Sequence, residues 1–172
     1  MHMIIALTGF MGCGKSSVGR SLAERLGCPF TDLDREVENR CGRSIPEIFA
    51  SEGEAGFRRM EVETLEQVLE RLEKLPLAVL ALGGGTQTVP QAAALLEKKT
   101  FLVYLEAGME TLRERLEGSV DRPLLREDPA GLLERRRPVY EKSRMKILTQ
   151  GKTIETLSAR IAENLKKISI FV

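Results

Sequence analysis

Histidine is almost missing from this chain of 172 residues, since the only one is His2 beside the N-terminus. Its scarcity excludes catalysis by a Ser-His-Asp or Cys-His arrangement, and it excludes a metal site built on several histidines. A general base in this protein is therefore expected to be a carboxylate.

The chain also has few cysteines, almost no net charge and no long apolar run. The three cysteines are odd in number and too widely spaced for a zinc site, which predicts reduced thiols. The 26 basic residues nearly balance the 25 acidic ones, so the composition does not favour a nucleic-acid partner. No apolar run approaches the ~20 residues that a membrane span needs, and the N-terminus lacks the pattern of a secretion signal. We therefore expect a cytoplasmic protein that binds neither nucleic acid nor membrane.

Glycine, in contrast, is concentrated near the N-terminus. Residues 9–16 read GFMGCGKS and fit G-x-x-x-x-G-K-[ST], the phosphate-binding loop, called the phosphate loop below. An apolar, strand-like run over 4–7 precedes it, and a helical pattern over 17–26 follows it. In this strand–loop–helix context, backbone N–H groups wrap a polyphosphate and the helix N-terminus adds partial positive charge. The segment therefore predicts ATP or GTP binding.

Individual residues of the phosphate loop have different expected roles. Lys15 is predicted to reach the β- and γ-phosphates, and the hydroxyl of Ser16 is predicted to join the Mg²⁺ shell. Gly12 lets the backbone approach a ligand closely. We interpret Cys13 as a small filler side chain and not as a reactive thiol.

Apolar strand-like runs alternate with helical patterns along the rest of the chain. This alternation predicts an α/β fold with a parallel sheet and helices on both faces, as one domain over 1–172. Ligands of such folds bind at the carboxyl ends of the strands. The expected strands are 4–8, 29–32, 77–82, 100–105 and 145–149, and the expected helices are 16–26, 57–73, 89–97, 108–117, 130–143 and 153–167.

Two segments interrupt the alternation. Residues 33–60 contain Ser44 and Glu47 at the spacing of a capping box, and we interpret them as a small helical insertion. Residues 118–129 show little periodicity and are interpreted as a mobile lid. Arg122 in this lid is placed to stabilise charge on a transferring phosphoryl group.

Carboxylates and glycines follow two of the expected strands. Side-chain alternation would put Asp32 and Asp34 on one side of a strand end, where one serves Mg²⁺ and the other a hydroxyl. The same residues also suit a solvated turn and an acidic helix start, so both interpretations stay open. The sequence Gly83–Gly85, called the glycine turn below, leaves room for a ligand against the main chain.

Arginines are clustered in two places. Arg58 and Glu61 lie three residues apart on one helix face, so the carboxylate can fix the guanidinium. A second cluster occupies residues 135–137. Arginine forks bind carboxylates and phosphates with two hydrogen bonds, although a single arginine is more often part of a solvated helix face.

Taken together, these segments resemble shikimate kinase over nearly the whole chain. The ordered set is far more specific than the phosphate loop alone. It comprises GFMGCGKS at 9–16, DLD at 32–34, GRSIPEIF at 42–49, FRRME at 57–61, GGG at 83–85, RPLL at 122–125 and RRPVY at 136–140.

The resemblance implies a fold and a reaction. The fold would be the three-layer P-loop NTPase fold of the nucleoside-monophosphate kinase type, with five parallel strands in the order 2-3-1-4-5. The reaction would move the γ-phosphoryl group of ATP onto the 3-hydroxyl of shikimate. The implied substrates are ATP and shikimate, with Mg²⁺ as cofactor, and we expect a monomer.

The resemblance also implies roles for particular residues. Catalysis would involve Lys15, Asp34 as the base, and Arg122. The nucleotide would contact Gly12, Cys13, Gly14, Lys15, Ser16, Ser17, Arg115 and Arg122, while shikimate would contact Asp34, Arg58, Gly83, Gly84, Gly85 and Arg136. Ser16 and Asp32 would serve the metal, and Glu61 would orient Arg58. The choice of Arg136 among its neighbours follows from its spacing to Tyr140.

Two other functions compete with this one. Another small-molecule kinase, such as a gluconate kinase, would share the phosphate loop and an anionic, hydroxylated substrate. A non-catalytic nucleotide sensor would keep the fold but lose residues of the acceptor site. The presence of Asp34, Arg58, Gly84, Gly85 and Arg136 argues against the sensor.

Overall fold

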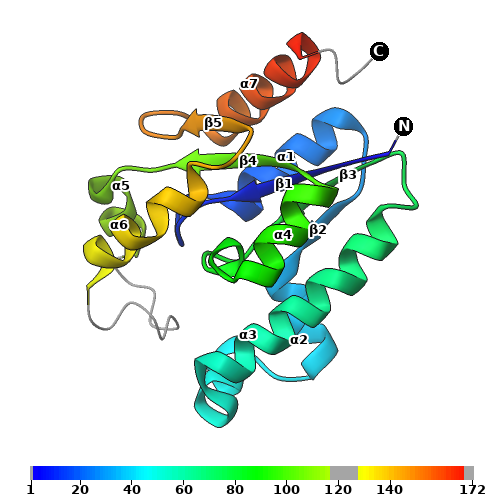
Figure 1. Cartoon of the computed structure of the whole chain (residues 1–172). Helices are drawn as coiled ribbons and strands as arrows, with labels where there is room; N and C mark the ends of the chain where they lie inside the picture. Colours follow the sequence, from blue (N-terminus) through cyan, green and yellow to red (C-terminus); the bar gives the residue numbers. More distant parts are fainter. Residues whose placement is uncertain (1, 117–127, 169–172) are drawn as a thin grey trace.

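The computed structural model describes residues 2–116 and 128–168, with the backbone alone for 113–116. Its sheet has five parallel strands in the order β2-β3-β1-β4-β5. The predicted α/β class and the strand order that the resemblance implies are confirmed (Figure 1). The strands are β1 (Met3–Thr8), β2 (Phe30–Asp32), β3 (Leu77–Ala81), β4 (Phe101–Glu106) and β5 (Met145–Leu148).

Helices cover both faces of this sheet (Figure 1). Helices α1 and α7 pack on one face, and α3 and α4 pack on the other. The helices are α1 (Lys15–Leu26), α2 (Leu33–Cys41), α3 (Ile45–Leu72), α4 (Pro90–Lys99), α5 (Met109–Leu116), α6 (Pro129–Tyr140) and α7 (Ile154–Lys167), with a short 3-10 helix, η1 (Thr86–Thr88).

The central strand β1 shows why the strands read as unbroken apolar runs. Its side chains alternate, so Ile5 and Leu7 join the core under α1 and α7, while Ile4 and Ala6 join the core under α3 and α4. All four are buried. A strand covered on both faces needs apolar residues at every position.

The 33–60 segment forms α2 and the first part of α3. The predicted capping box is confirmed, because the Ser44 and Glu47 side chains each bond to the other residue's backbone N–H. From there α3 runs to Leu72 but is interrupted at Gly53, whose φ of 67° and ψ of −176° are not helical and put a kink between two helical parts. The predicted break between the capping-box helix and the helix near residues 57–73 is therefore present, although the second part begins a few residues earlier than expected. A small apolar cluster around Val37, Ile48 and Phe57 holds this segment together.

The predicted lid falls mostly outside the described residues, because residues 117–127, including Arg122, are among those not described. Its last two residues begin α6. Asp128 accepts a hydrogen bond from the N–H of Gly131 at 3.0 Å, and Pro129 occupies the first turn, where its missing N–H has no helical partner to lose. Among the described residues, none of the helices combines the length and apolar character needed to cross a membrane.

Candidate active site

A cleft of about 900 Å³ opens at the carboxyl ends of the strands. Its walls come from the phosphate loop after β1, the start of α2 after β2, the glycine turn after β3, and from α3 and α6. The structure therefore gathers residues that are far apart in sequence, from Met11 to Leu157, around one space. The predicted residues that line it are Gly12, Cys13, Gly14, Lys15, Ser16, Ser17, Asp34, Arg58, Gly83, Gly84, Gly85 and Arg136.

The phosphate loop has a backbone that only glycine adopts readily. Gly9, Gly12 and Gly14 have φ values of 141°, 79° and 99°. Gly14 is also the N-cap of α1, and no side chain caps this helix end. The first N–H groups of α1 are therefore available to an anion at the loop, which is the arrangement that binds phosphate groups.

The side chain of Lys15 folds back onto the phosphate loop. Its ammonium donates to the carbonyl oxygens of Gly9 at 2.9 Å and Phe10 at 3.0 Å, and the residue is only 8% exposed. Cys13 lies in the core beside it and is fully buried, which agrees with its interpretation as a filler. Lys15 must leave these carbonyls to reach a phosphate group.

Ser16 and Asp32 meet at the outer side of the phosphate loop. The Ser16 hydroxyl donates to Asp32 Oδ2 at 2.5 Å, while Asp32 Oδ1 accepts from the N–H groups of Asp34 at 3.1 Å and Arg35 at 3.4 Å. Asp32 therefore caps α2 and contacts the phosphate loop at the same time. The two interpretations of this aspartate, helix start and functional group, are compatible.

The strand-end argument for Asp34 was wrong. Strand β2 ends at Asp32, and Asp34 lies in the first turn of α2, so helix geometry and not strand alternation directs its side chain. That side chain lines the cleft. Its Oδ1 would lie 2.8 Å from a Cβ atom at Gly83, which places the carboxylate directly against the glycine turn.

The donor set at Ser16 and Asp32 suits Mg²⁺. A hydroxyl and a carboxylate supply the hard oxygen atoms that this ion prefers. Across residues 2–116 and 128–168, no group of three or more His, Cys, Asp or Glu side chains could hold a metal by itself. An ion at Ser16 and Asp32 would therefore take its remaining ligands from water and from substrate phosphate groups.

The glycine turn is packed against other site residues. A Cβ atom at Gly83 would lie 2.7 Å from Glu61 Oε1, and one at Gly85 would lie 2.2 Å from Arg58 Nη2. Neither distance is possible without a shift. The sequence predicted room for a ligand at this turn, and the structure shows that side chains of the site itself also need that room.

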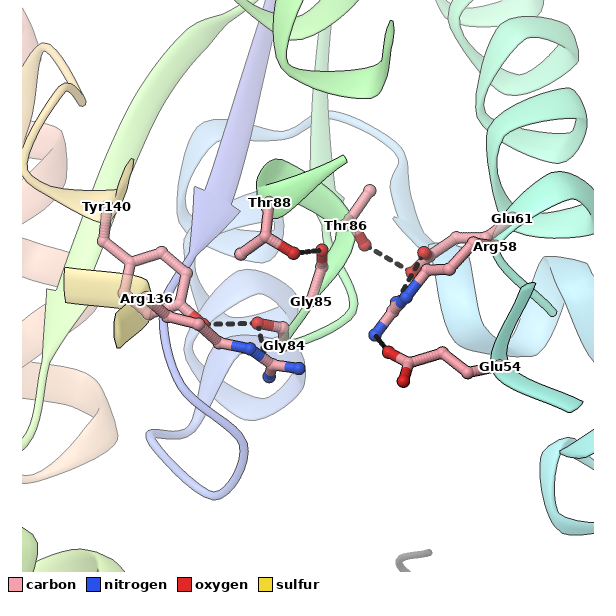
Figure 2. Close-up of polar contacts among 9 residues, drawn as sticks. All are labelled: Glu54, Arg58, Glu61, Gly84, Gly85, Thr86, Thr88, Arg136 and Tyr140. Carbon is pink, nitrogen blue, oxygen red and sulfur yellow. Dashed lines mark hydrogen bonds and ion pairs between the residues drawn. The ribbon is translucent and has the colours of Figure 1, made fainter. Parts of the chain in front are cut away.

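Arg58 is held by a carboxylate on each side (Figure 2). Its Nη1 lies 2.7 Å from Glu61 Oε2, and its Nη2 lies 3.3 Å from Glu54 Oε1. Glu61 is completely buried, and its Oε1 accepts a hydrogen bond from the Thr86 hydroxyl at 2.6 Å. The expected contact between Arg58 and Glu61 is present, and the chain Thr86–Glu61–Arg58 fixes the guanidinium beside the glycine turn.

Arg136 is the member of the second arginine cluster that lines the cleft. Its Nη1 donates to the carbonyl of Gly84 at 3.2 Å, whereas Arg135 is exposed and Arg137 pairs with Glu134 at 2.8 Å. In Figure 2, the guanidinium groups of Arg136 and Arg58 lie on either side of the glycine turn. Two cations therefore face the space between them.

Tyr140 binds the same carbonyl as Arg136. Its hydroxyl donates a short hydrogen bond to the oxygen of Gly84 (Figure 2). Burial raises the pKa of Tyr140 to about 12, so the phenol keeps its proton at neutral pH and remains a donor.

Sequence reasoning missed the roles of Thr86 and Tyr140. Thr86 directly follows the glycine turn and Tyr140 ends the RRPVY motif, so their positions were known, but their partners Glu61 and Gly84 are distant in sequence.

Other residues of the site are only partly accounted for. Arg115 lies in α5, and the structure describes only the backbone of this residue. Further lining residues without a predicted role include Met11, Phe49, Phe57, Lys152, Ile154 and Leu157.

Comparisons with known proteins assign the family. A family model described as shikimate kinase matches residues 11–166. The chain belongs to the shikimate kinase family. A shikimate kinase of Chlorobaculum parvum is 38% identical over 185 residues, which cover 97% of this chain and 96% of the relative. One from Thermus thermophilus is 42% identical over 167 residues, covering 94% and 89%.

Solved structures give the same result. A shikimate kinase of Acinetobacter baumannii in complex with shikimate superposes with a TM-score of 0.91 at 34% identity, covering 99% of this chain and 97% of that one. A shikimate kinase of Aquifex aeolicus has a TM-score of 0.82 at 34% identity, covering 99% and 100%. An APS kinase of Mycobacterium tuberculosis, with 16% identity and a TM-score of 0.64 over 96% and 98%, shares the fold. The resemblance to shikimate kinases is confirmed.

Proposed function

We propose that this protein transfers the γ-phosphoryl group of ATP to the 3-hydroxyl of shikimate, giving shikimate 3-phosphate and ADP for chorismate and aromatic amino-acid synthesis. One observation carries the proposal. The phosphate loop and a pair of arginines around the glycine turn open into the same cleft. Family membership and the structural relative that binds shikimate support the same substrate.

The acceptor side of the cleft suits a small hydroxylated acid. Arg58 and Arg136 supply the cationic forks for the shikimate carboxylate. Asp34 accepts hydrogen bonds from the hydroxyl groups and takes the proton of the attacking one. The glycine turn, through Gly83, Gly84 and Gly85, gives the ring a flat wall.

The phosphate side supplies positioning and positive charge. Lys15 moves from its loop carbonyls to the β- and γ-phosphates, and the N–H groups of the phosphate loop hold the rest of the polyphosphate. Ser16 and Asp32 would hold Mg²⁺, with Asp32 acting through water, and the bound ion would supply positive charge that neutralises phosphate oxygens. Arg115 packs on the adenine, and Arg122 in the lid stabilises the transferring group.

A coupled ADP-release assay tests the proposed reaction. Purified protein receives ATP and Mg²⁺ with shikimate, with gluconate, or with no acceptor. We expect ADP release that depends on shikimate and remains at background in the other two reactions. Release with gluconate, or confirmed ATP binding without release on shikimate, would contradict the proposed acceptor.

Asp34→Asn tests the proposed base. The amide keeps the size of the side chain but cannot take a proton, so kcat should fall by about a hundredfold or more. ATP affinity, measured by calorimetry, should stay near the wild-type value because Asp34 lies against the glycine turn. An equal loss of ATP affinity would assign Asp34 to the nucleotide side.

We also propose that the chain acts as a cytoplasmic monomer of one domain, with residues 33–60 binding the acceptor and residues 118–129 closing as a lid. Size-exclusion chromatography at several concentrations tests the monomer. Hydrogen exchange of the 118–129 peptide tests the lid, since protection should rise when both substrates are present. Unchanged exchange would count against closure.

A further inference from the structure

Gln87 carries a buried amide that touches neither proposed substrate site. It lies in η1, two residues after the glycine turn, and is only 4% exposed. Both ends of the amide are bonded: Oε1 accepts from the Thr8 hydroxyl at 2.8 Å, and Nε2 donates to the carbonyl of Val139 at 2.9 Å. A buried amide held at both ends has a fixed orientation and links the two groups that it contacts.

The two partners of Gln87 lead to the two halves of the cleft. Thr8 is fully buried at the end of β1 and directly precedes Gly9, the first residue of the phosphate loop. Val139 lies in the last turn of α6, three residues after Arg136. The side chain of Gln87 therefore connects the start of the phosphate loop with the helix that carries a proposed acceptor arginine.

A second bond runs beside this one. Tyr140, next to Val139, donates to Gly84 in the glycine turn. Arg136 in the same helix donates to the Gly84 carbonyl as well. The segment from the glycine turn to η1 thus binds α6 at two points: the Gly84 carbonyl, which accepts two hydrogen bonds, and the Gln87 amide. Two separate points of attachment restrict rotation of α6, which a single one would permit.

The end of α6 needs such tertiary bonds. Pro138 lies inside the helix and has no N–H, so it removes one helical hydrogen bond from the last turns. Arg136 sits one turn from this weakened end, and its guanidinium must face Arg58 across the glycine turn to bind one carboxylate. A small rotation of α6 would move the guanidinium away from that position.

We propose that Gln87 is a positioning residue for the acceptor: its amide fixes α6, and through it Arg136, against the glycine turn and the strand that enters the phosphate loop. The inference deepens the proposed function and rests on it. Gln87 acts through Arg136 and contacts no substrate. It sets the affinity for the acceptor and leaves the affinity for ATP to the phosphate loop.

Gln87→Met tests this role, because methionine keeps the length of the side chain and removes both hydrogen bonds. We expect the shikimate KM to rise about fivefold, the effect of losing a net hydrogen bond, with the ATP KM within about twofold of wild type. Calorimetric titration of shikimate without ATP should show the same loss of affinity. If Gln87→Met does not fold, Gln87→Glu keeps the acceptor for Thr8, removes the donor to Val139, and should raise the shikimate KM similarly.

Gln91→Met is the matched control. Gln91 is exposed on α4, where its amide bonds to Glu66 at 3.1 Å, so the same substitution should leave both KM values unchanged. A lower melting temperature for Gln87→Met with an unchanged shikimate KM would show a purely structural role and overturn the inference. Equal rises in both KM values would overturn it too.

The assay separates this inference from the function on which it rests. Shikimate-dependent ADP release is first measured on the wild-type protein, and its absence there contradicts the proposed function. Wild-type release together with a normal shikimate KM in Gln87→Met contradicts the role of Gln87 alone.

Discussion

The two sides of the cleft differ in how far their charged groups are already in place. On the acceptor side, Arg58 is bound to Glu61, Glu61 to Thr86, and Arg136 to the Gly84 carbonyl. On the phosphate side, the ammonium of Lys15 is bound to carbonyls of its own loop. On the proposed acceptor side the arginines are thus already held by other residues, whereas on the proposed phosphate side Lys15 would have to leave its loop carbonyls to reach a phosphate group.

This difference has a physical reason. A fixed pair of arginines needs buried partners to hold it, and Glu61 and the glycine turn supply them. A polyphosphate instead supplies several negative charges of its own, which are sufficient to draw a lysine away from neutral carbonyls. We therefore expect substitutions on the acceptor side to change shikimate affinity and stability together, and substitutions on the phosphate side to change turnover with little effect on stability.

Lys15→Ala should have the largest effect. It removes a cation from the transferring phosphoryl group, and loss of one such stabilising group typically costs about 10²–10³ in kcat. Because the described contacts of the Lys15 ammonium are all with its own loop, namely the carbonyls of Gly9 and Phe10 and the sulfur of Cys13, the melting temperature should change little. Coupled ADP release and thermal unfolding measure the two quantities. Lys98→Ala, at an exposed position of α4, is the control. Near-wild-type turnover of Lys15→Ala would contradict the role assigned to Lys15.

Arg58→Ala should raise the shikimate KM by tens of fold, since hydrogen bonds between charged groups contribute about 1.5–3 kcal/mol each. It should also lower stability by about 3 kcal/mol, because the completely buried carboxylate of Glu61 loses its partner. Steady-state kinetics and urea unfolding measure the two effects.

Arg58→Ala with Glu61→Gln is the matched double variant. It should regain much of the lost stability, because the buried charge is gone, but none of the shikimate affinity. A double variant as unstable as the single one would show that the cost does not come from the buried charge.

The sequence predicted the features that depend on local pattern. The phosphate loop and the spacing of Arg58 and Glu61 were predictable, because each rests on a motif or on the helical period. The strand order followed only from the resemblance to shikimate kinase. The contacts of Thr86 with Glu61 and of Tyr140 with Gly84 were not. These pairs are 25 and 56 residues apart, and only tertiary packing brings them together.

One error of the sequence prediction has a local cause. Asp34 was placed at a strand end, but the carboxylate of Asp32 caps the following N–H groups and starts α2 directly. The break that was expected before residue 57 is present at Gly53, whose non-helical backbone separates the two parts of α3. In both places a single residue decides where a helix starts or is interrupted, and the periodic pattern around it does not record the exact position.

Gly85→Ala should have a moderate effect confined to the acceptor side. The added methyl group would lie 2.2 Å from Arg58 Nη2, so the guanidinium must move and partly lose its bond to Glu61. We expect the shikimate KM to rise about tenfold, as for the loss of one hydrogen bond between charged groups, with an unchanged ATP KM. Gly108→Ala, where the methyl group would meet only Gln150 Oε1 at 3.7 Å, is the control. A normal shikimate KM in Gly85→Ala would show that the position of Arg58 is not critical.

Tyr140→Phe should have the smallest effect at neutral pH. Its comparison with the wild type at alkaline pH also tests whether ionisation of Tyr140 lowers stability. At neutral pH the variant loses the hydrogen bond to Gly84, so stability should fall by about 1 kcal/mol, or a few degrees in melting temperature. The control Tyr104→Phe removes a hydroxyl from the neighbouring ring, 5.3 Å away between centroids. It should leave the shikimate KM unchanged, whereas Tyr140→Phe should raise it about twofold.

The pH dependence follows from the raised pKa of Tyr140. Burial lifts it from an ordinary value of about 10 to about 12, so the folded state favours the protonated phenol. Its contribution to stability is fully present below about pH 10 and is lost as the pH rises through about 12. The melting temperature of the wild type should therefore fall more steeply than that of Tyr140→Phe between these values. Parallel curves of melting temperature against pH would mean that ionisation of the Tyr140 phenol does not destabilise the fold. The fixed arrangement around Gly84 would then depend on Arg136 and Gln87 instead.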